Sequence, residues 1–427
     1  MFKSEKICVI GLGYVGLPLL VELSNHFGVV GFDINQSRIN DLRLGIDRTQ
    51  EISFDYLKNK IDNKCISFTN SADDIADCDV YIVTVPTPVD SFNTPNFEPL
   101  QLATELVGKA LKAGNLVVYE STVYPGATEE ICVPILEKVS KLIWREDFNV
   151  GYSPERINPG DPVNKLPDIQ KVISGDTDSS LLRIAEIYQK IITAGLYHAK
   201  SIAVAEAAKV IENVQRDVNI ALVNEIAIIC SHLKLRTQDV LDTAKTKWNF
   251  LPFQPGMVGG HCIGVDPYYL AHKAKSVGYH PELILAGRRL NEHMTEHVSL
   301  EICKRLIGKD KSIKGSRIAI LGITFKENCP DTRNSKAFEL KAELESYNFN
   351  VDLFDPYSKE FDEKLTDSCK NLQSFSEQKK YDSIIIFSPH VEIIKLGKKQ
   401  IMSLLTENGL LYDVKAVFEP CENTLSL

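Results

Sequence analysis

The strongest constraint on this chain is a glycine pattern near its beginning, Gly11-Leu12-Gly13-Tyr14-Val15-Gly16. It lies between an apolar run at 7–10, typical of a buried strand, and a helical pattern at 17–27. Glycines at this spacing allow a tight turn, close approach of the backbone to a pyrophosphate, and close packing of helix on strand. Asp33 ends a second apolar run, 17 residues after Gly16. The pattern therefore predicts a dinucleotide-binding unit.

The expected cofactor is NAD. The Asp33 carboxylate can accept hydrogen bonds from a ribose 2′-OH and would repel the 2′-phosphate of NADP. Arg38 acts in the opposite direction, because a nearby guanidinium can accommodate that phosphate. A glycine-tolerant turn without any ligand is the structural alternative. The residues expected to contact NAD in this segment are Gly11, Gly13, Tyr14, Val15, Gly16, Asp33 and Arg38.

Apolar runs alternate with helical patterns at both ends of the chain. Runs at 80–85 and 116–120 extend the first set, and runs at 317–322, 351–356 and 381–387 form a second. Apolar strands separated by helices predict parallel sheets covered on both faces. The expected fold is thus α/β, with two Rossmann-like doubly wound domains.

The middle of the chain is predicted to be helical. Residues 201–233 contain neither Pro nor Gly and repeat apolar residues at helical spacing, which predicts a central helix about 50 Å long. Helical sequence resumes at 268–307. The predicted domains are a Rossmann-like NAD-binding domain at 1–198, a helical central domain at 199–312 and a second Rossmann-like domain at 313–427.

Composition excludes several classes of function. The formal charge of −9 gives no support for binding to nucleic acid, and no uncharged apolar stretch is long enough for membrane insertion. The 10 cysteines form no CxxC pair, and the N-terminal residues do not resemble a secretory leader. We therefore expect reduced thiols in a cytoplasmic protein.

Cys262 has a context unlike that of the other cysteines, Gly259-Gly260-His261-Cys262-Ile263-Gly264-Val265-Asp266. Paired glycines permit close approach of a bulky ligand, and a polar loop can favour a reactive thiolate. A thiol adds to an aldehyde as a hemithioacetal, which can lose hydride to NAD⁺ and leave a thioester for water to cleave. The alternative is a structural cysteine in a tight loop.

Two polar residues lie on the predicted central helix. Lys209 and Asn213 are four positions apart and share a face. If that face lines a cleft, Lys209 can stabilise an oxyanion and Asn213 can position water or sugar hydroxyls. The alternative is a solvated lysine on an Ala-rich helix.

Together these motifs resemble those of the UDP-glucose/GDP-mannose dehydrogenase superfamily. The resemblance extends over nearly the whole chain and is greatest to the branch acting on UDP-N-acetylhexosamines, the UDP-GlcNAc and UDP-GalNAc 6-dehydrogenases. The segments that carry it are GLGYVG at 11–16, VPTP at 85–88, STV at 121–123, SPE at 153–155, AKVIEN at 208–213, KWNFLPF at 247–253, GGHCIGVDPYYL at 259–270 and FKENCPDTR at 325–333.

The resemblance implies two successive NAD⁺-dependent oxidations at C6, giving a UDP-uronate for surface polysaccharide such as capsule or O-antigen. It implies Cys262 as nucleophile, Lys209 as oxyanion stabiliser, Asn213 and Asp266 as organisers of water and base, and Thr122 and Glu155 as residues that position water, with Glu155 a candidate base. Further implied NAD contacts are Thr87, Thr122 and Arg333. The implied substrate residues are Glu155, Arg156, Lys209, Asn213, Phe253, Gly259, Phe325 and Lys326.

The implied partners are a UDP-sugar and a second copy of the chain, in a homodimer or higher homo-oligomer through the long helix. The resemblance thus implies a central and dimerisation domain at 199–312 and a Rossmann-like UDP-binding domain at 313–427. Two departures near the sugar, Arg156 and His261, set the chain apart from the UDP-glucose branch. Oxidation of UDP-glucose or GDP-mannose, a one-step hydroxyacid-type dehydrogenase, and a non-catalytic nucleotide-sugar-binding regulator are the alternatives. His293-Met294-Thr295-Glu296-His297 fits a zinc-peptidase pattern, but the rest of the chain needs no metal.

Overall fold

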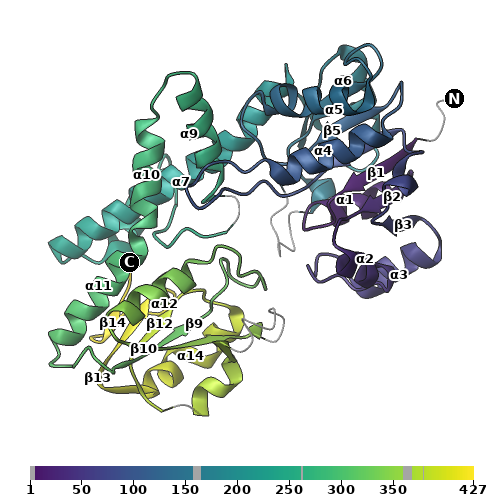
Figure 1. The fold of residues 1–427 in the computed structure, drawn as a ribbon. Helices are drawn as coiled ribbons and strands as arrows, with labels where there is room; N and C mark the ends of the chain where they lie inside the picture. The colour runs from purple at the N-terminus through teal and green to yellow at the C-terminus, as the bar shows by residue number, and fades with distance from the viewer. Residues whose placement is uncertain (1–4, 157–164, 261–262, 359–367, 378) are drawn as a thin grey trace. The chain divides into compact units, whose positions relative to one another are not determined.

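The computed structural model forms two compact units, residues 1–212 with 268–279 and residues 213–267 with 280–427 (Figure 1). The residues that the structure describes are 5–156, 165–260, 263–358, 368–377 and 379–427.

The first unit is built on an eight-stranded sheet with the order β3-β2-β1-β4-β5-β6-β7-β8. All neighbouring strands run parallel except β6 and β7. The order 3-2-1-4-5-6 of the first six strands is that of dinucleotide-binding folds. The strands are β1 (Lys6–Ile10), β2 (Gly28–Phe32), β3 (Ile66–Thr69), β4 (Val80–Val83), β5 (Leu116–Tyr119), β6 (Asn149–Tyr152), β7 (Lys171–Gly175) and β8 (Leu196–His198).

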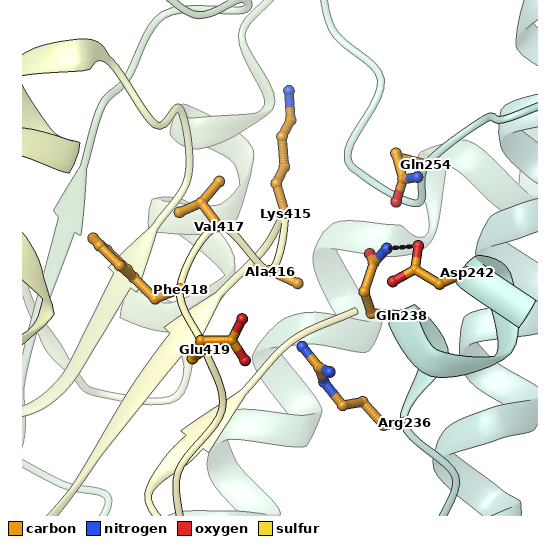
Figure 2. A pocket seen from close by; sticks show the side chains of 9 residues that line it. All are labelled: Arg236, Gln238, Asp242, Gln254, Lys415, Ala416, Val417, Phe418 and Glu419. Carbon is orange, nitrogen blue, oxygen red and sulfur yellow. Dashed lines mark hydrogen bonds between the residues drawn. The ribbon is translucent and has the colours of Figure 1, made fainter.

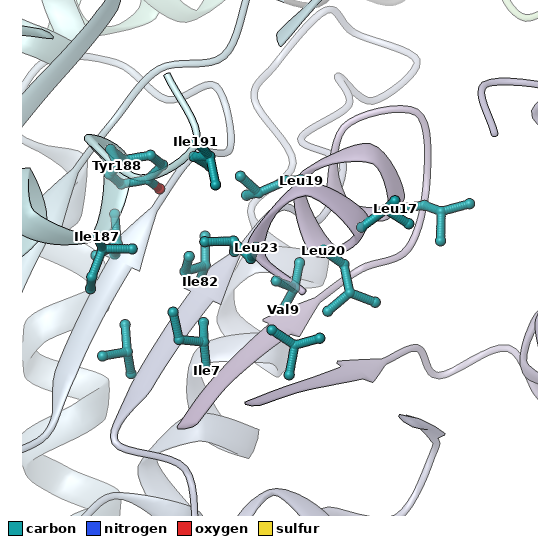
Figure 3. Close-up of a cluster of buried hydrophobic side chains, with 14 of the residues drawn as sticks. Ile7, Val9, Leu17, Leu19, Leu20, Leu23, Ile82, Ile187, Tyr188 and Ile191 are labelled. Carbon is teal, nitrogen blue, oxygen red and sulfur yellow. The ribbon is translucent and has the colours of Figure 1, made fainter. Parts of the chain in front are cut away.

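Helices cover both faces of this sheet, because both faces are apolar. Along β1, Ile7 and Val9 belong to one buried cluster, whereas Cys8 and Ile10 belong to another. Figure 3 shows the first cluster, in which side chains of α1 lie over β1. The helical segments of this unit are α1 (Gly16–Leu23), α2 (Gln36–Arg43), α3 (Phe54–Asp62), η1 (Ala72–Ile75), α4 (Glu98–Ala110), η2 (Thr128–Cys132), α5 (Val133–Ser140), η3 (Leu166–Asp168), α6 (Asp178–Tyr188) and α9 (Asp266–Ser276), which begins in the second unit.

The predicted central helix is α7 (Ile202–Leu233), 32 residues long. The helical sequence expected at 268–307 folds as three helices. Gly278, with a φ of +84°, and Pro281 separate α9 from α10 (Glu282–Glu292), and α11 (Met294–Ile307) follows His293. A short helix α8 (Thr237–Lys245) follows α7. Among the described helices, none is long and apolar enough to cross a bilayer.

The second unit contains a parallel six-stranded sheet, ordered β11-β10-β9-β12-β13-β14. It repeats the 3-2-1-4-5 order of the first sheet, so the prediction of two doubly wound domains with a helical middle is confirmed. The domain limits at 198 and 312 remain predictions. The elements are β9 (Arg317–Leu321), α12 (Lys336–Ser346), β10 (Asn350–Asp355), β11 (Cys369–Asn371), η5 (Leu372–Glu377), β12 (Tyr381–Ile386), α14 (Val391–Ser403), β13 (Leu405–Asp413) and β14 (Thr424–Leu425).

Candidate active site

The glycine turn after β1 has the shape that a dinucleotide requires. Gly11 has a φ of +93°, and a Cβ on Gly16 would lie 1.8 Å from the Gly11 carbonyl oxygen. Helix α1 therefore packs too closely for a side chain at that position. A Cβ on Gly13 would meet nothing within 4 Å, so the backbone there is open to a ligand. Tyr14 and Val15 are half-buried at the start of α1, whose N-terminal N–H groups suit a pyrophosphate.

Asp33 and Arg38 are both tied to this turn. The Asp33 carboxylate accepts hydrogen bonds from the backbone N–H groups of Leu12 and Asn35, each at 2.9 Å. The Arg38 Nε donates to the Leu12 carbonyl at 2.9 Å, and its Nη2 lies 2.8 Å from the buried Asp47 carboxylate. Because a buried carboxylate balances the guanidinium, the site suits a ribose hydroxyl better than a 2′-phosphate.

Thr87 and Thr122 follow the carboxyl ends of adjacent strands, β4 and β5, and both are half-buried. Ser121 Oγ donates to the Val85 carbonyl at 2.7 Å and so joins the two loops. Tyr269 of α9 donates to the Pro88 carbonyl at 2.9 Å. The two threonines therefore lie at the sheet edge where open α/β folds bind ligands.

Glu206 of α7 holds the loop that begins at Thr122. Its carboxylate accepts the backbone N–H groups of Gly126 at 2.5 Å and Thr128 at 2.9 Å. The side chain is fully buried, and this burial raises the pKa of Glu206 to about 7. The contact ties the loop to the turn of α7 that precedes Lys209.

Lys209 and Asn213 are buried on one face of α7, with 6% and 3% of their surfaces exposed. The alternative of a solvated Lys209 is therefore wrong. Arg156 packs against the same helix, since its Nη2 donates to the Lys209 carbonyl at 3.1 Å and its Nε lies 2.6 Å from Glu212. The side chain of Arg156, a predicted substrate contact, is thus bound to α7 in this structure.

Glu155 lies on a buried cluster of charges. Lys171 Nζ is 2.7 Å from Glu155 Oε2 and 3.1 Å from Glu120 Oε2. The hydroxyl of Tyr188 donates to the other oxygen of Glu120. Burial raises the pKa of Glu120 to about 7, although Lys171 acts to lower it. Burial also acts to lower the pKa of Lys171, but Glu120 and Glu155 outweigh it and raise that pKa.

In the second unit the structure joins two predicted catalytic residues that are far apart in the sequence. Asn213 Nδ2 donates to Asp266 Oδ2 at 2.5 Å, and both side chains are buried. Asp266 lies at the first residue of α9, where the helix dipole favours its negative charge. The amide therefore fixes the orientation of the carboxylate.

Phe325 packs against the paired glycines of the cysteine loop. A Cβ on Gly260 would lie 2.8 Å from the Phe325 ring, and one on Gly259 would lie 2.7 Å from the Asn334 carbonyl oxygen. Lys326 and Phe253 are half-buried. Cys262 and His261 lie outside the described residues.

A cavity of about 380 Å³ in the second unit lies between α8 and the segment that follows β13 (Figure 2). Arg236, Gln238 and Asp242 line one side, and Lys415 and Glu419 line the other. Gln254 at its rim is the neighbour of Phe253, and Lys415 pairs with Glu327, the neighbour of Lys326. One lining residue is thus next in sequence to Phe253, and another contacts the neighbour of Lys326.

Arg333 is half-exposed and pairs with Asp331 at 2.5 Å in the second unit. Its predicted contact with NAD remains a prediction. In the described part of the chain, no three His, Cys, Asp or Glu side chains are grouped as a metal site would need. Seven of the nine described cysteines are buried.

Three models of one family match successive parts of the chain. The NAD binding domain of the UDP-glucose/GDP-mannose dehydrogenase family matches residues 5–192, its central domain residues 203–293 and its UDP binding domain residues 319–420. The UDP-N-acetyl-D-glucosamine 6-dehydrogenase of Pseudomonas aeruginosa is 51% identical over 425 residues, covering all of both chains. This chain belongs to the UDP-glucose/GDP-mannose dehydrogenase family.

Other relatives of this dehydrogenase are also similar to it along nearly its whole length. The UDP-N-acetyl-D-glucosamine 6-dehydrogenase of Salmonella typhi is 50% identical, covering 98% of this chain and 97% of that one. The solved structure of a UDP-D-ManNAc dehydrogenase from Pyrococcus horikoshii superposes with a TM-score of 0.87 at 27% identity, covering 99% of this chain and 98% of that one. The chain is thus an NAD-dependent oxidoreductase.

Sequence reasoning missed several residues that organise the site of this dehydrogenase. Asn224 of α7 exchanges two hydrogen bonds with the Gly256 backbone and so holds the loop that leads to the cysteine. Asp217 lies 2.6 Å from the buried Arg288 of α10. Polar residues at helical spacing within an apolar helix were the available signal. No sequence signal marked Lys171 and Glu120, because their role depends on contact with Glu155 in the folded protein.

Proposed function

We propose that this enzyme oxidises the C6 hydroxyl of UDP-N-acetylglucosamine, with UDP-N-acetylgalactosamine as the nearest alternative, to the UDP-N-acetylhexosaminuronate. The product would serve surface polysaccharide synthesis. The observation that carries the proposal is the 51% identity, over all of both chains, to a UDP-N-acetyl-D-glucosamine 6-dehydrogenase. The unusual Arg156 and His261 beside the expected sugar site support it over UDP-glucose.

The reaction removes four electrons, and NAD⁺, when bound, accepts a hydride in each of two oxidations. Cys262 would add through its sulfur to the C6 aldehyde, and the hemithioacetal would then become a thioester. Water would attack the thioester carbon, Glu155 would take the water's proton, and the C–S bond would break to release the carboxylate and the thiolate. Lys209 would stabilise the oxyanions, and the Asn213–Asp266 pair would orient the water.

The remaining predicted residues would hold the ligands. Gly11, Gly13 and Asp33, with Thr87 and Thr122, would bind NAD. We place uridine diphosphate in and beside the cavity of the second unit, because Arg236 and Lys415 could exchange their carboxylate partners Asp239 and Glu327 for phosphate. The lining residue Gln254 also follows Phe253 in the sequence. Phe418 in the same lining offers an apolar surface for the base.

We further propose a homodimer through α7. Five apolar side chains on this helix are about half-exposed or more, and their spacing of 7, 11, 7 and 4 residues places them on one face. An exposed apolar stripe of this kind marks an interaction surface. Its members are Val204, Ile211, Leu222, Ile229 and Leu233. A cytoplasmic location is proposed because Cys262 must stay reduced to act.

The test is the yield of NADH from a panel of UDP-GlcNAc, UDP-GalNAc, UDP-ManNAc, UDP-glucose and GDP-mannose. We expect two NADH per UDP-GlcNAc consumed, with the uronate as product. A yield of one NADH with an aldehyde product would contradict the cysteine mechanism. Absence of turnover with every sugar of the panel would contradict the proposed function.

Cys262→Ser should abolish uronate formation, because an ester or aldehyde-level species replaces the thioester. The matched control is Cys421→Ser, which alters an exposed thiol, and we expect it to turn over as wild type does. Unchanged uronate production by Cys262→Ser would remove that residue from its role.

A further inference from the structure

The charge cluster beneath Glu155 gathers residues from four parts of the first unit. Glu120 follows β5, Glu155 follows β6, Lys171 begins β7 and Tyr188 ends α6. The side chains of Lys171, Glu120 and Glu155 are at most 5% exposed. One ammonium is thus shared by two carboxylates in a nearly water-free environment.

Stability does not explain such a cluster. Burying charges is costly, and replacing a buried ion pair by apolar residues of similar volume is often neutral or stabilising. The Lys171 ammonium also lies 5.1 Å from the centre of the Tyr188 ring, a cation–π contact that helps to hold the charge in place. The cluster is therefore better explained by an effect on Glu155, the member that the proposed reaction uses.

Both oxygens of Glu155 are anchored. Lys171 holds Oε2, and the backbone N–H of Arg156 donates to Oε1 at 2.5 Å. A carboxylate oxygen has two lone pairs, so Oε1 keeps acceptor capacity for a further proton donor. A cavity of about 10 Å³ beside Glu155, Arg156 and Lys171 has about the room that one water needs.

We propose that Lys171 is the positioning residue of Glu155, and that Glu120 holds the Lys171 ammonium and tunes its effect. The proposal rests on the proposed function, in which Glu155 takes a proton from water. Lys171 fixes the orientation of the Glu155 carboxylate and places a positive charge beside it. Glu120 competes for the same ammonium, so its charge sets how much of that positive charge acts on Glu155.

The groups that face the cluster fix the expected pH dependence. They are Lys171, Tyr188 and the two carboxylates themselves, with Arg156 at the surface side. Because the pKa of Glu120 is raised to about 7, this residue is itself largely protonated in the acid range, so Glu120→Gln changes the charge beside Glu155 little there. Removing Glu120 and Lys171 together leaves Glu155 buried without a cation, so it becomes protonated at higher pH.

The experiment compares Glu120→Gln and the double variant Glu120→Gln/Lys171→Met with wild type. The double variant removes one charge of each sign, so it avoids two uncompensated buried carboxylates. In plots of kcat against pH with UDP-GlcNAc, we expect the acid limb to move upward by about one pH unit in the double variant and to stay close to that of wild type in Glu120→Gln. In the double variant kcat should fall about 10- to 100-fold, while KM for the sugar nucleotide changes little.

The matched control is Glu5→Gln/Arg183→Met, which removes a partly buried ion pair of 2.6 Å in the same unit, at the opposite end of the strands. Its acid limb should coincide with that of wild type. Acid limbs that coincide in all variants, even with lowered kcat, would overturn the proposal and leave the cluster a purely structural role. Failure of wild type to form any uronate would overturn the proposed function instead.

Discussion

Asp33 and Arg38 illustrate how one backbone turn can select between two cofactors. The carboxylate binds the Leu12 N–H, and the guanidinium binds the Leu12 carbonyl. Asp47 then neutralises the guanidinium in a buried pair. A guanidinium this close to the expected ribose would favour a 2′-phosphate if its charge were unpaired. Here Asp47 already neutralises that charge, so the turn favours NAD.

Asp33→Asn should therefore weaken discrimination against NADP. The negative charge of Asp33 repels a 2′-phosphate and strengthens hydrogen bonds from a ribose hydroxyl, and the variant lacks this charge. The kcat/KM for NAD should therefore fall about 10- to 100-fold relative to that for NADP. The measurement is initial rates with each cofactor at saturating UDP-GlcNAc. Asp62→Asn, at an exposed ion pair with Lys58, is the matched control. An unchanged ratio of the two cofactors would contradict the assignment of Asp33.

Helix α7 has an inverted amphipathic pattern. Its buried face carries polar side chains, and its opposite face exposes the apolar stripe from Val204 to Leu233. The spacing of the polar residues, 3, 4, 4 and 7, keeps them on one face of the helix. Such a helix is stable only where each buried polar group has a partner. The buried polar residues are Glu206, Lys209, Asn213, Asp217 and Asn224.

Glu206 gives this element a pH dependence of known sign. Burial raises its pKa to about 7, against about 4.3 for a free glutamate. Between these values the folded protein binds a proton that the unfolded chain has released, so this group lowers the free energy of unfolding as pH rises. The glutamine of Glu206→Gln cannot titrate. The melting temperature of wild type, compared with that of the variant at the same pH, should therefore fall as the pH rises from 5 to 7.

Thermal unfolding of the two proteins at several pH values measures this difference. Glu130→Gln changes an exposed carboxylate of the following segment and serves as the matched control. A difference in melting temperature between wild type and Glu206→Gln that does not vary with pH would contradict the assignment.

At the scale of the whole molecule, the exposed apolar stripe of α7 is the feature that indicates association with a second chain. Leu222→Glu/Ile229→Glu places two charges in its middle, so we expect the proposed dimer to dissociate. Analytical ultracentrifugation measures the mass of each species. Leu182→Glu changes a somewhat more exposed leucine on α6 and should leave the mass unchanged. A wild-type protein that sediments as a monomer would contradict the dimer.

The sequence by itself determined the two doubly wound sheets, the long helix and the family, because these depend on local patterns. Glycine turns, strand periodicity and motifs such as those around Asp33 and Asp266 are readable from neighbouring residues. It also singled out Asn213 and Asp266, which the structure joins across 53 positions.

Only the tertiary structure decided which charges meet. Lys171 contacts Glu120 across 51 positions and Glu155 across 16, and no local pattern distinguishes it from a solvated lysine. In the same way, only packing showed that Asp47 neutralises Arg38 and that Lys209 is buried. The physical reason is that burial and charge pairing arise when distant segments pack together, and they set the protonation and orientation on which chemistry depends.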